Sequence, residues 1–281
     1  MRRNLYGLKC FWLAATVLLV GTLASTAQAA PKADLWPHWS AHNDQWSKAI
    51  DHSRWQQLLD QRVHKNADGI NRVSYKQFSA VEKNQLASYI QALAGLAPTQ
   101  MNRAEQLAYW INLYNALTVQ VVLNYPKAKS ILKMKSGFFS IGPWGDELLT
   151  IEGKAVTLND IEHRILRPIW QEHRLHFALN CASIGCPNLS KIAYTSSNAQ
   201  AQLLRAQAEY LNHPRGVSLR ENKLQLSSIF DWYQVDFAGD EKSLKAYLAA
   251  QLPQQAESIL ASENAIDYAY DWDLNEQKSP Q

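Results

Sequence analysis

Two cysteines and a histidine lie close together in the segment HFALNCASIGCP at residues 176–187. A thiol becomes a nucleophile when a nearby base takes its proton and a third polar group orients that base. Cys181 is the candidate nucleophile, because it follows an apolar run and precedes turn-forming residues, and loops at strand ends often present reactive groups. The chemistry would be that of a cysteine-dependent hydrolase or acyl-transfer enzyme.

His176 and His163 are the two candidate bases for this thiol. The alternation in residues 175–180 predicts a strand, and a regular continuation of that strand would turn Cys181 away from His176. A pair between Cys181 and His176 therefore requires the chain to bend after Asn180. If it does not bend, His163 on the preceding helix is the alternative base.

Glu162, Asn112 and Asn115 are the candidates for the orienting group. The two asparagines share an interior face of a helix predicted over residues 104–123, which is apolar nearly all round. A buried amide without partners costs about 1–3 kcal/mol, so each must bond to a loop, a water or a ligand. A structural role that holds a neighbouring loop is the alternative to catalysis. Backbone amides of residues 182–185 could stabilise an oxyanion.

A disulfide between Cys181 and Cys186 is the main alternative to a reactive thiol. An exported chain would lose Cys10 with its leader and would meet an oxidising compartment, so the two remaining cysteines could pair. A loop this short adds only about 2 kcal/mol of stability. The protein would then be a noncatalytic binding or assembly domain, with its many Trp and Tyr residues lining a recognition groove. Thiol-disulfide exchange is the weakest reading, because the chain has no Cys-x-x-Cys motif.

The first 29 residues have the pattern of a cleavable signal peptide. Arg2, Arg3 and Lys9 precede an apolar run at residues 11–20, and the small residues AQA at 27–29 end the segment. The apolar run is shorter than the roughly 20 residues that cross a bilayer, so we expect no stable membrane insertion after cleavage. The sequence therefore predicts a periplasmic or secreted protein.

Charge and cysteine spacing narrow the classes of partner. The leader holds three of the 28 Lys and Arg residues and none of the 25 Asp and Glu residues, so the remaining chain is formally neutral. Without a basic stripe we expect no nucleic-acid binding. A Cys-x4-Cys spacing with no second ligand pair predicts no metal site, and no cofactor is indicated. The expected partner is an unidentified small molecule or peptide.

The remaining patterns predict an α+β fold, a mostly helical single domain with a small mixed or antiparallel sheet. The periodicity predicts helices over about 41–61, 78–96, 104–123, 198–211, 241–251 and 254–261. A further helix, capped by Thr157 and Asp160, carries Glu162 and His163. Hairpins are predicted at 147–158 and 217–226, and an alternating strand at 266–274. We expect a hairpin, the cysteine strand and this last strand to form the sheet. Asp231 and Asp236 are expected to cap helices or lie at the surface.

Several blocks of the sequence resemble a known family. They are WINLYNA at 110–116, IEHRILR at 161–167, HFALNCAS at 176–183, CP at 186–187, WY at 232–233 with DF at 236–237, and YDWDLN at 270–275. In this order they resemble the domain of unknown function 547 (DUF547), in the form of an exported bacterial member. The resemblance implies a DUF547-like domain at 101–275. Together with the leader at 1–29, the expected organisation adds an N-terminal helical extension packed on the core at 30–100 and a disordered tail at 276–281. The resemblance implies no activity, because none is established for the family.

Overall fold

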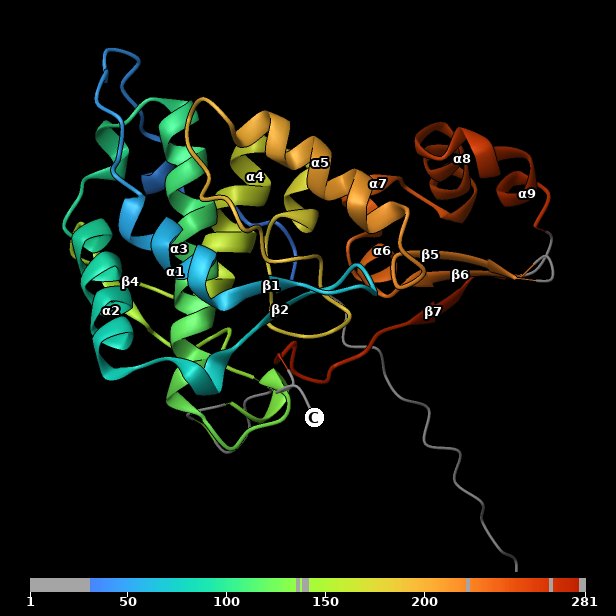
Figure 1. The fold of residues 1–281 in the computed structure, drawn as a ribbon. Coiled ribbons are helices and arrows are strands. Elements are labelled where there is room, and N and C mark those ends of the chain that lie inside the picture. Colours follow the sequence, from blue (N-terminus) through green and yellow to red (C-terminus); the bar gives the residue numbers. More distant parts are fainter. Residues whose placement is uncertain (1–30, 135–136, 138–141, 221–222, 263–264, 278–281) are drawn as a thin grey trace, which may run out of the picture.

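The computed structural model describes residues 31–134, 137, 142–220, 223–262 and 265–277, and the predicted leader lies outside this part of the chain. Helices dominate, and the strands form only two- and three-stranded sheets (Figure 1). The predicted α+β class is confirmed. A large hydrophobic cluster surrounds the central helices, and a smaller cluster lies among the C-terminal helices and their sheet.

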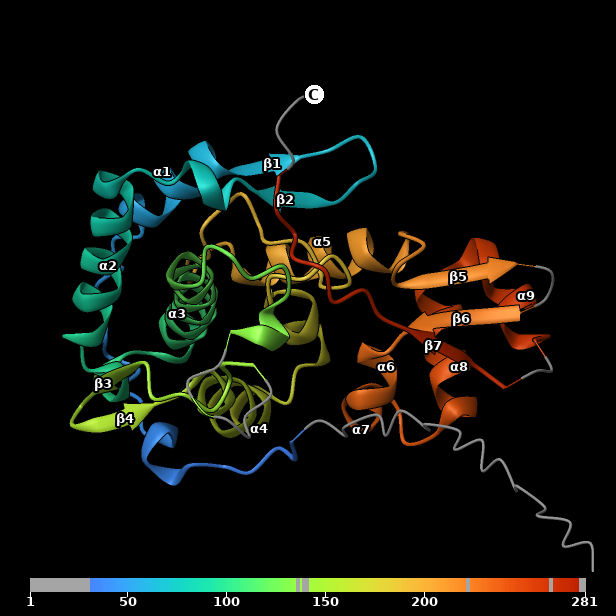
Figure 2. The ribbon, with the colours of Figure 1, turned by 90° about the horizontal axis from the view of Figure 1, so that it is seen from below.

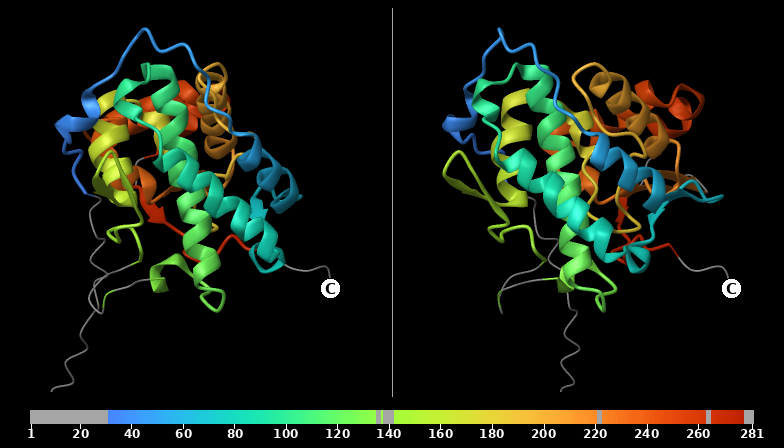
Figure 3. Two further views of the ribbon diagram at one scale, coloured as in Figure 1. Left: turned by 90° about the vertical axis from the view of Figure 1, so that its left-hand side faces the viewer. Right: turned by 60° about the vertical axis from the view of Figure 1, so that its left-hand side comes forward.

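Helix α3 (Arg103–Asn124) runs through the larger cluster and is buried along almost its whole length. Its first turn is capped, because the Asn102 side chain accepts a hydrogen bond from the Glu105 amide at 2.9 Å. Helix α2 (Ala80–Ala94) packs against both α3 and α1 (Ser53–Arg62), as Figures 2 and 3 show. The predictions for α2 and α3 are confirmed to within about two residues, which is the usual uncertainty of a helix end.

The first helix was predicted to begin near residue 41, and this prediction is wrong. Between residues 41 and 52 the chain bonds to the start of α3 instead of to itself. The Ile50 amide donates to the Glu105 carboxylate at 2.7 Å, and the Asn43 amide donates to the Met101 carbonyl at 3.0 Å. Because the backbone groups find these distant partners, α1 starts only at Ser53.

Within the residues that the structure describes, seven short strands form three separate sheets. The strands are β1 (Val63–Lys65), β2 (Asn71–Val73), β3 (Leu149–Ile151), β4 (Lys154–Val156), β5 (Val217–Arg220), β6 (Lys223–Ser227) and β7 (Asp267–Ala269). β1 with β2 and β3 with β4 are antiparallel pairs, and the third sheet has the order β5-β6-β7 with β7 parallel to β6. Both predicted hairpins are confirmed. The predicted sheet is partly right. The last strand does join a hairpin, the second one, but the expectation that the cysteine segment joins them is wrong.

The predicted cysteine strand is also wrong, because residues 173–177 form a 3-10 helix. Glu172 caps this helix by accepting from the Arg174 amide at 3.0 Å. After the helix, the Asn115 side chain bonds to both the Ala178 carbonyl and the Asn180 amide, at 3.0 and 2.8 Å. These side-chain bonds satisfy backbone groups that a neighbouring strand would otherwise pair with.

A helix with π-helical bonding in its middle leads into the cysteine segment. The capping pair that the sequence predicted is present, with the Asp160 amide donating to the Thr157 hydroxyl at 3.0 Å. Residues Asp160–Leu166 are π-helical, and α4 (Arg167–Trp170) follows without a break. A π segment is a rare element that is often found at functional sites.

Pro168 explains how the N-terminal segment is attached to this helix. Proline has no backbone N–H, so the His163 carbonyl cannot receive an i→i+5 bond. It accepts from the Asp34 amide at 3.0 Å instead, and the Arg164 carbonyl accepts from the Trp36 amide at 3.0 Å. Residues 34–36 therefore lie along the helix and are part of the folded domain.

The rest of the described chain is mainly helical. The helices are α5 (Ala199–Leu211), α6 (Ile229–Trp232), α7 (Gln234–Phe237), α8 (Glu241–Gln251) and α9 (Ala256–Leu260). Short 3-10 helices occupy Pro37–Ser40, Tyr75–Gln77, Pro98–Gln100, Ile131–Lys133 and Pro253–Gln255. Within the described residues, none of these helices combines the length and apolar character needed to span a membrane.

His52, in the larger cluster, makes the stability of the fold depend on pH. Its imidazole is buried beside Tyr89, and its Nε2 atom has no hydrogen-bond partner in the described chain. Burial lowers the pKa of His52 to about 4, whereas the unfolded chain titrates near 6.5. The unfolded state thus binds this proton more tightly, so His52 should remove roughly 3 kcal/mol of stability as the pH falls from about 7 to below its folded pKa.

The check is urea unfolding across this pH range, comparing wild type with His52→Gln. The variant should lose this part of the pH dependence, because glutamine does not titrate. His42→Gln, at an exposed histidine nearby in the sequence, is the matched control and should follow the wild type. Equal slopes for wild type and His52→Gln would contradict the assignment.

Candidate functional site

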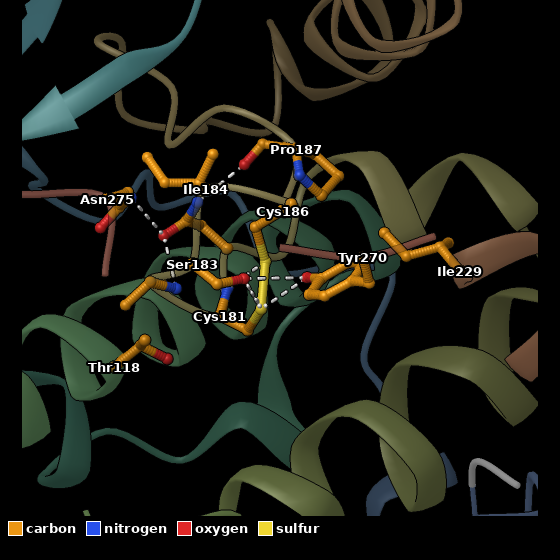
Figure 4. The surroundings of a disulfide bond; sticks show 12 residues. Thr118, Cys181, Ser183, Ile184, Cys186, Pro187, Ile229, Tyr270 and Asn275 are labelled. Carbon is orange, nitrogen blue, oxygen red and sulfur yellow. Dashed lines mark hydrogen bonds between the residues drawn. A yellow bond between two sulfur atoms is a disulfide. The ribbon is translucent and has the colours of Figure 1, made fainter. Parts of the chain in front are cut away.

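Cys181 and Cys186 are joined by a disulfide, with their Cα atoms 6.1 Å apart (Figure 4). Cys186 is buried, and Cys181 is partly exposed. The disulfide was the alternative that the sequence left open, and it is confirmed. The expectation of a free Cys181 thiol is corrected, because its sulfur is already bonded.

The backbone amides of the loop between the two cysteines hold it in place by hydrogen bonds to neighbouring segments. The Ala182 amide donates to the Asn180 side chain at 3.0 Å. The Ile184 and Gly185 amides donate, each at 2.8 Å, to carbonyls of residues 273 and 271 in the C-terminal segment. These three amides are therefore not available to an oxyanion, which corrects the oxyanion site expected at residues 182–185. Gly185 is required here, since a Cβ would lie 2.9 Å from the Asp271 backbone nitrogen.

The polar neighbours of the Cys181 sulfur are two hydroxyl groups. Tyr270 Oη lies 3.1 Å from Cys181 Sγ, Ser183 Oγ lies 3.3 Å from it, and the two oxygens lie 3.0 Å apart (Figure 4). Burial raises the pKa of the Tyr270 hydroxyl above its usual value, so it stays protonated and cannot act as a base. No histidine among the described residues makes a hydrogen bond to the sulfur.

His176 instead lies between two carboxylates in the interior. Its Nε2 is 2.7 Å from Asp236 Oδ2, and its Nδ1 is 3.8 Å from Glu162 Oε1. The Tyr233 ring stacks on the imidazole, with 3.9 Å between ring centroids. The His176 side chain is 2% exposed, so a ligand at the surface could be influenced by it only through these neighbours.

Asp236 also holds a buried arginine. Arg167 Nε donates to Asp236 Oδ2 at 2.6 Å, and an Arg167 Nη1 contact with His163 Nδ1 at 3.1 Å extends the chain of contacts. Partial burial opposes ionisation of Asp236, but hydrogen bonds from His176 and Arg167 outweigh it and hold the pKa of the carboxyl well below its usual range. Asp236 was expected at a cap or at the surface, and that expectation is wrong.

Glu162 and His163 lie on the π segment and join the same network. The Tyr114 hydroxyl donates to Glu162 Oε2 at 3.0 Å. Burial alone would raise the pKa of Glu162, yet the nearby imidazoles and the Tyr114 and Tyr233 hydroxyls lower it below its usual value. Burial, reinforced by the Arg167 charge, lowers the pKa of His163, so this imidazole tends to stay neutral.

The four candidate acid–base and nucleophilic residues thus form two groups. Glu162, His163 and His176 meet in what we call the ion cluster, which also contains Arg167, Tyr233 and Asp236. Cys181 makes no hydrogen bond to this cluster among the described residues, although its neighbour Tyr270 feels the charge of Glu162. The structure therefore brings the predicted bases together but does not pair either of them with the sulfur.

The two candidate asparagines each hold a loop. Asn112 donates to the Tyr194 carbonyl at 2.7 Å and accepts from the Tyr194 amide at 3.0 Å. Asn115 makes the equivalent pair of bonds to the chain before Cys181. Both amides are buried, and the bonds of both lead to backbone and not to a histidine. They fix the positions of loops on either side of α3.

The ion cluster reaches the surface at a pocket of about 590 Å³, which we call the Asp236 pocket. It lies between the N-terminal segment, the end of α4 and α7. Its lining includes Leu35, Arg167, Glu172, His173, Val235 and Asp236. This volume falls in the range of small-molecule sites. No set of three or more His, Cys, Asp or Glu side chains in the described chain is arranged to hold a metal ion.

Sequence reasoning missed the roles of Arg167, Tyr233, Asp236 and Tyr270. All four lie in the blocks that carry the family resemblance, so a signal was present. Their spacing could not reveal the contacts, because Asp236 lies far from Arg167 and His176 in the sequence, and Tyr270 far from Cys181.

The comparisons with known proteins give one match. A family model described as "Protein of unknown function, DUF547" matches residues 98–211. The matched segment contains α3, the π segment and both cysteines, and it ends before Asp236 and Tyr270. Neither the curated proteins nor the solved structures that were searched contain a match.

Proposed function

Residues 98–211 of this chain belong to the DUF547 family, and on that premise we propose that the protein is an exported, noncatalytic binding domain. The observation that carries the proposal is the disulfide between Cys181 and Cys186. It occupies the only sulfur that sequence reasoning offered as a nucleophile. A disulfide also fits an exported protein, since such bonds persist in oxidising compartments.

Further support comes from the surroundings of the bond. Three of the four amides at residues 182–185 are bonded, both candidate asparagines hold backbone, and the candidate bases are bound within the ion cluster. The disulfide closes the loop, and backbone hydrogen bonds attach the loop to residues 271–275, which supports a structural role for the bond. The ion cluster and its pocket leave a charged, concave surface for a small molecule or peptide.

Peptide mapping of the mature protein tests this proposal. Purified protein is alkylated under denaturing, nonreducing conditions and then digested. We expect residues 181 and 186 to appear unalkylated in a linked peptide, and we expect the chain to begin at residue 30. Removing the bond in the Cys181→Ser, Cys186→Ser double variant should cost about 2 kcal/mol of stability, because the closed loop is short.

Hydrolysis of chromogenic esters, with and without a dithiol reductant, completes the test. A binding domain should show no hydrolysis that distinguishes wild type from Cys181→Ala. Alkylation of Cys181 in protein that was never reduced, together with loss of hydrolysis in Cys181→Ala, would contradict the proposal.

A cysteine-dependent hydrolase or acyl-transfer enzyme is the second candidate, and one observation favours it. The hydroxyl of Tyr270 touches the Cys181 sulfur and also feels the charge of Glu162 in the ion cluster. Reduction of the disulfide by a dithiol would release two thiols and oxidise the dithiol to its own disulfide. Cys181 could then attack an acyl group only after the side chains move. Activity that appears with reductant and requires Cys181 would favour this candidate.

A further inference from the structure

The lining of the Asp236 pocket includes a carboxylate that its neighbours hold in the ionised form. The carboxylate of Asp236 uses Oδ2 for both of its donors, His176 and Arg167. Its other oxygen, Oδ1, accepts no hydrogen bond from the described residues, and Asp236 lines the pocket. An ionised carboxylate with one open acceptor favours a charged donor, because charge-assisted hydrogen bonds are stronger than neutral ones.

The charges around the pocket are nearly balanced. Asp236 and Glu172 contribute two carboxylates, and Arg167 contributes one guanidinium. His173 adds no charge near neutral pH, since burial lowers its pKa. Arg174 pairs with Glu172 and neutralises it, so Asp236 is the carboxylate with an open oxygen. This open Oδ1 attracts a hydrogen-bond donor, and a charged donor more strongly than a neutral one.

The rim of the pocket is apolar. Leu35 and Val235 are 44% and 78% exposed, so both aliphatic side chains present apolar surface to a ligand. They come from the N-terminal segment and from α7, so they lie on two different walls. An apolar group bound here would cover both side chains and remove apolar surface from water.

We propose that the Asp236 pocket binds a ligand with a primary ammonium group on an apolar body. The ammonium would donate to Asp236 Oδ1, and the apolar body would cover Leu35 and Val235. This inference rests on the proposed binding function and names its ligand class. Two sources share this chemistry, the free N-terminus of a short peptide and an aliphatic amine.

Calorimetry with three probes tests the ligand class and distinguishes its sources. The probes are leucyl-alanine, its N-acetyl form and pentylamine. Binding of leucyl-alanine or pentylamine, weakened by added salt, supports the proposal, and the one that binds identifies the source. N-acetyl-leucyl-alanine should bind at least about tenfold more weakly than leucyl-alanine, which corresponds to about 1.4 kcal/mol. Equal binding of the acetylated peptide, or no binding of either ammonium probe at millimolar concentration, overturns it.

A pair of exposed valines supplies the matched variants. Val235→Lys places a positive charge at the rim and should weaken ammonium binding about tenfold, because like charges repel at short range. Val81→Lys makes the same change at an equally exposed valine on α2, outside the pocket, and should bind as the wild type does. Thermal unfolding of both variants checks that the fold is kept. Equal affinities of the two variants would overturn the assignment to this pocket.

The outcomes also separate this inference from the proposed function. If the ammonium probes fail while the disulfide is intact and no Cys181-dependent hydrolysis is found, only the ligand class is wrong. If Cys181-dependent hydrolysis is found, the binding-domain proposal fails whatever the pocket binds.

Discussion

Replacing Asp236 with asparagine is expected to lower the free energy of unfolding by about 3 kcal/mol. The reason is the pair of buried donors that share one carboxylate oxygen. Arg167 is 4% exposed and His176 is 2% exposed at the side chain, so water cannot replace the lost negative charge. Removing one partner of a buried ion pair costs more than the pair contributes, because the other charge stays buried without compensation.

Urea unfolding followed by tryptophan fluorescence measures this effect. Asp273→Asn is the matched control, because Asp273 is exposed and its side chain has no bond or ion pair within the described residues. The control should change stability by less than about 0.5 kcal/mol. Similar losses in the two variants would show that the ion cluster does not stabilise the fold.

The effect of Asp236 should also depend on pH. Its folded pKa is depressed below the value of about 3.9 for an unfolded aspartate, so its contribution is complete above that pH. As the pH falls below about 4 towards the folded pKa, the contribution is progressively lost. The difference between wild type and Asp236→Asn should therefore shrink in acid, and a difference that grows would contradict the assignment.

The second large effect is expected for Asn112→Leu, a change that keeps the side chain close to its original size. Leucine cannot bond to the Tyr194 amide and carbonyl, so two buried backbone groups would lose their partners. At roughly 2 kcal/mol for each, the variant should lose about 4 kcal/mol of stability.

Asn124→Leu, at the exposed end of the same helix, is the control for the change in residue type. It should unfold within about 0.5 kcal/mol of the wild type. Hydrogen exchange gives a second readout, because the Tyr194 amide should lose protection in Asn112→Leu and keep it in the control. A stable Asn112→Leu variant with a protected Tyr194 amide would contradict the structural role of this asparagine.

The sequence predicts those parts of the fold that depend on nearby residues. The cap at Asn102 and the apolar surface of α3 are local features, as is the pair formed by Thr157 and Asp160. Hairpins are set by alternation and a short turn, and both were found. The two cysteines lie five residues apart, close enough for the disulfide to be weighed in advance.

The errors arise where distant residues replace local bonding. An alternating pattern predicted a strand around His176, but bonds from Asn115 and the cap at Glu172 produce a 3-10 helix and a turn. Asp236 looked like a surface acid, because nothing near it in the sequence is basic. Its partners, Arg167 and His176, come from elements that only the folded chain brings beside it.

The last residues of the described chain bond to three parts of the fold. β7 adds to β6 beside the smaller cluster, residues 271–275 bond to the disulfide loop, and the Val73 amide donates to the Asn275 carbonyl at 2.9 Å. Contacts between distant parts of a chain form slowly, because a long loop must close first. Synthesis delivers this segment after all the elements that it joins. A product truncated before β7 would therefore lack these bonds and would expose an unpaired β6 edge to aggregation.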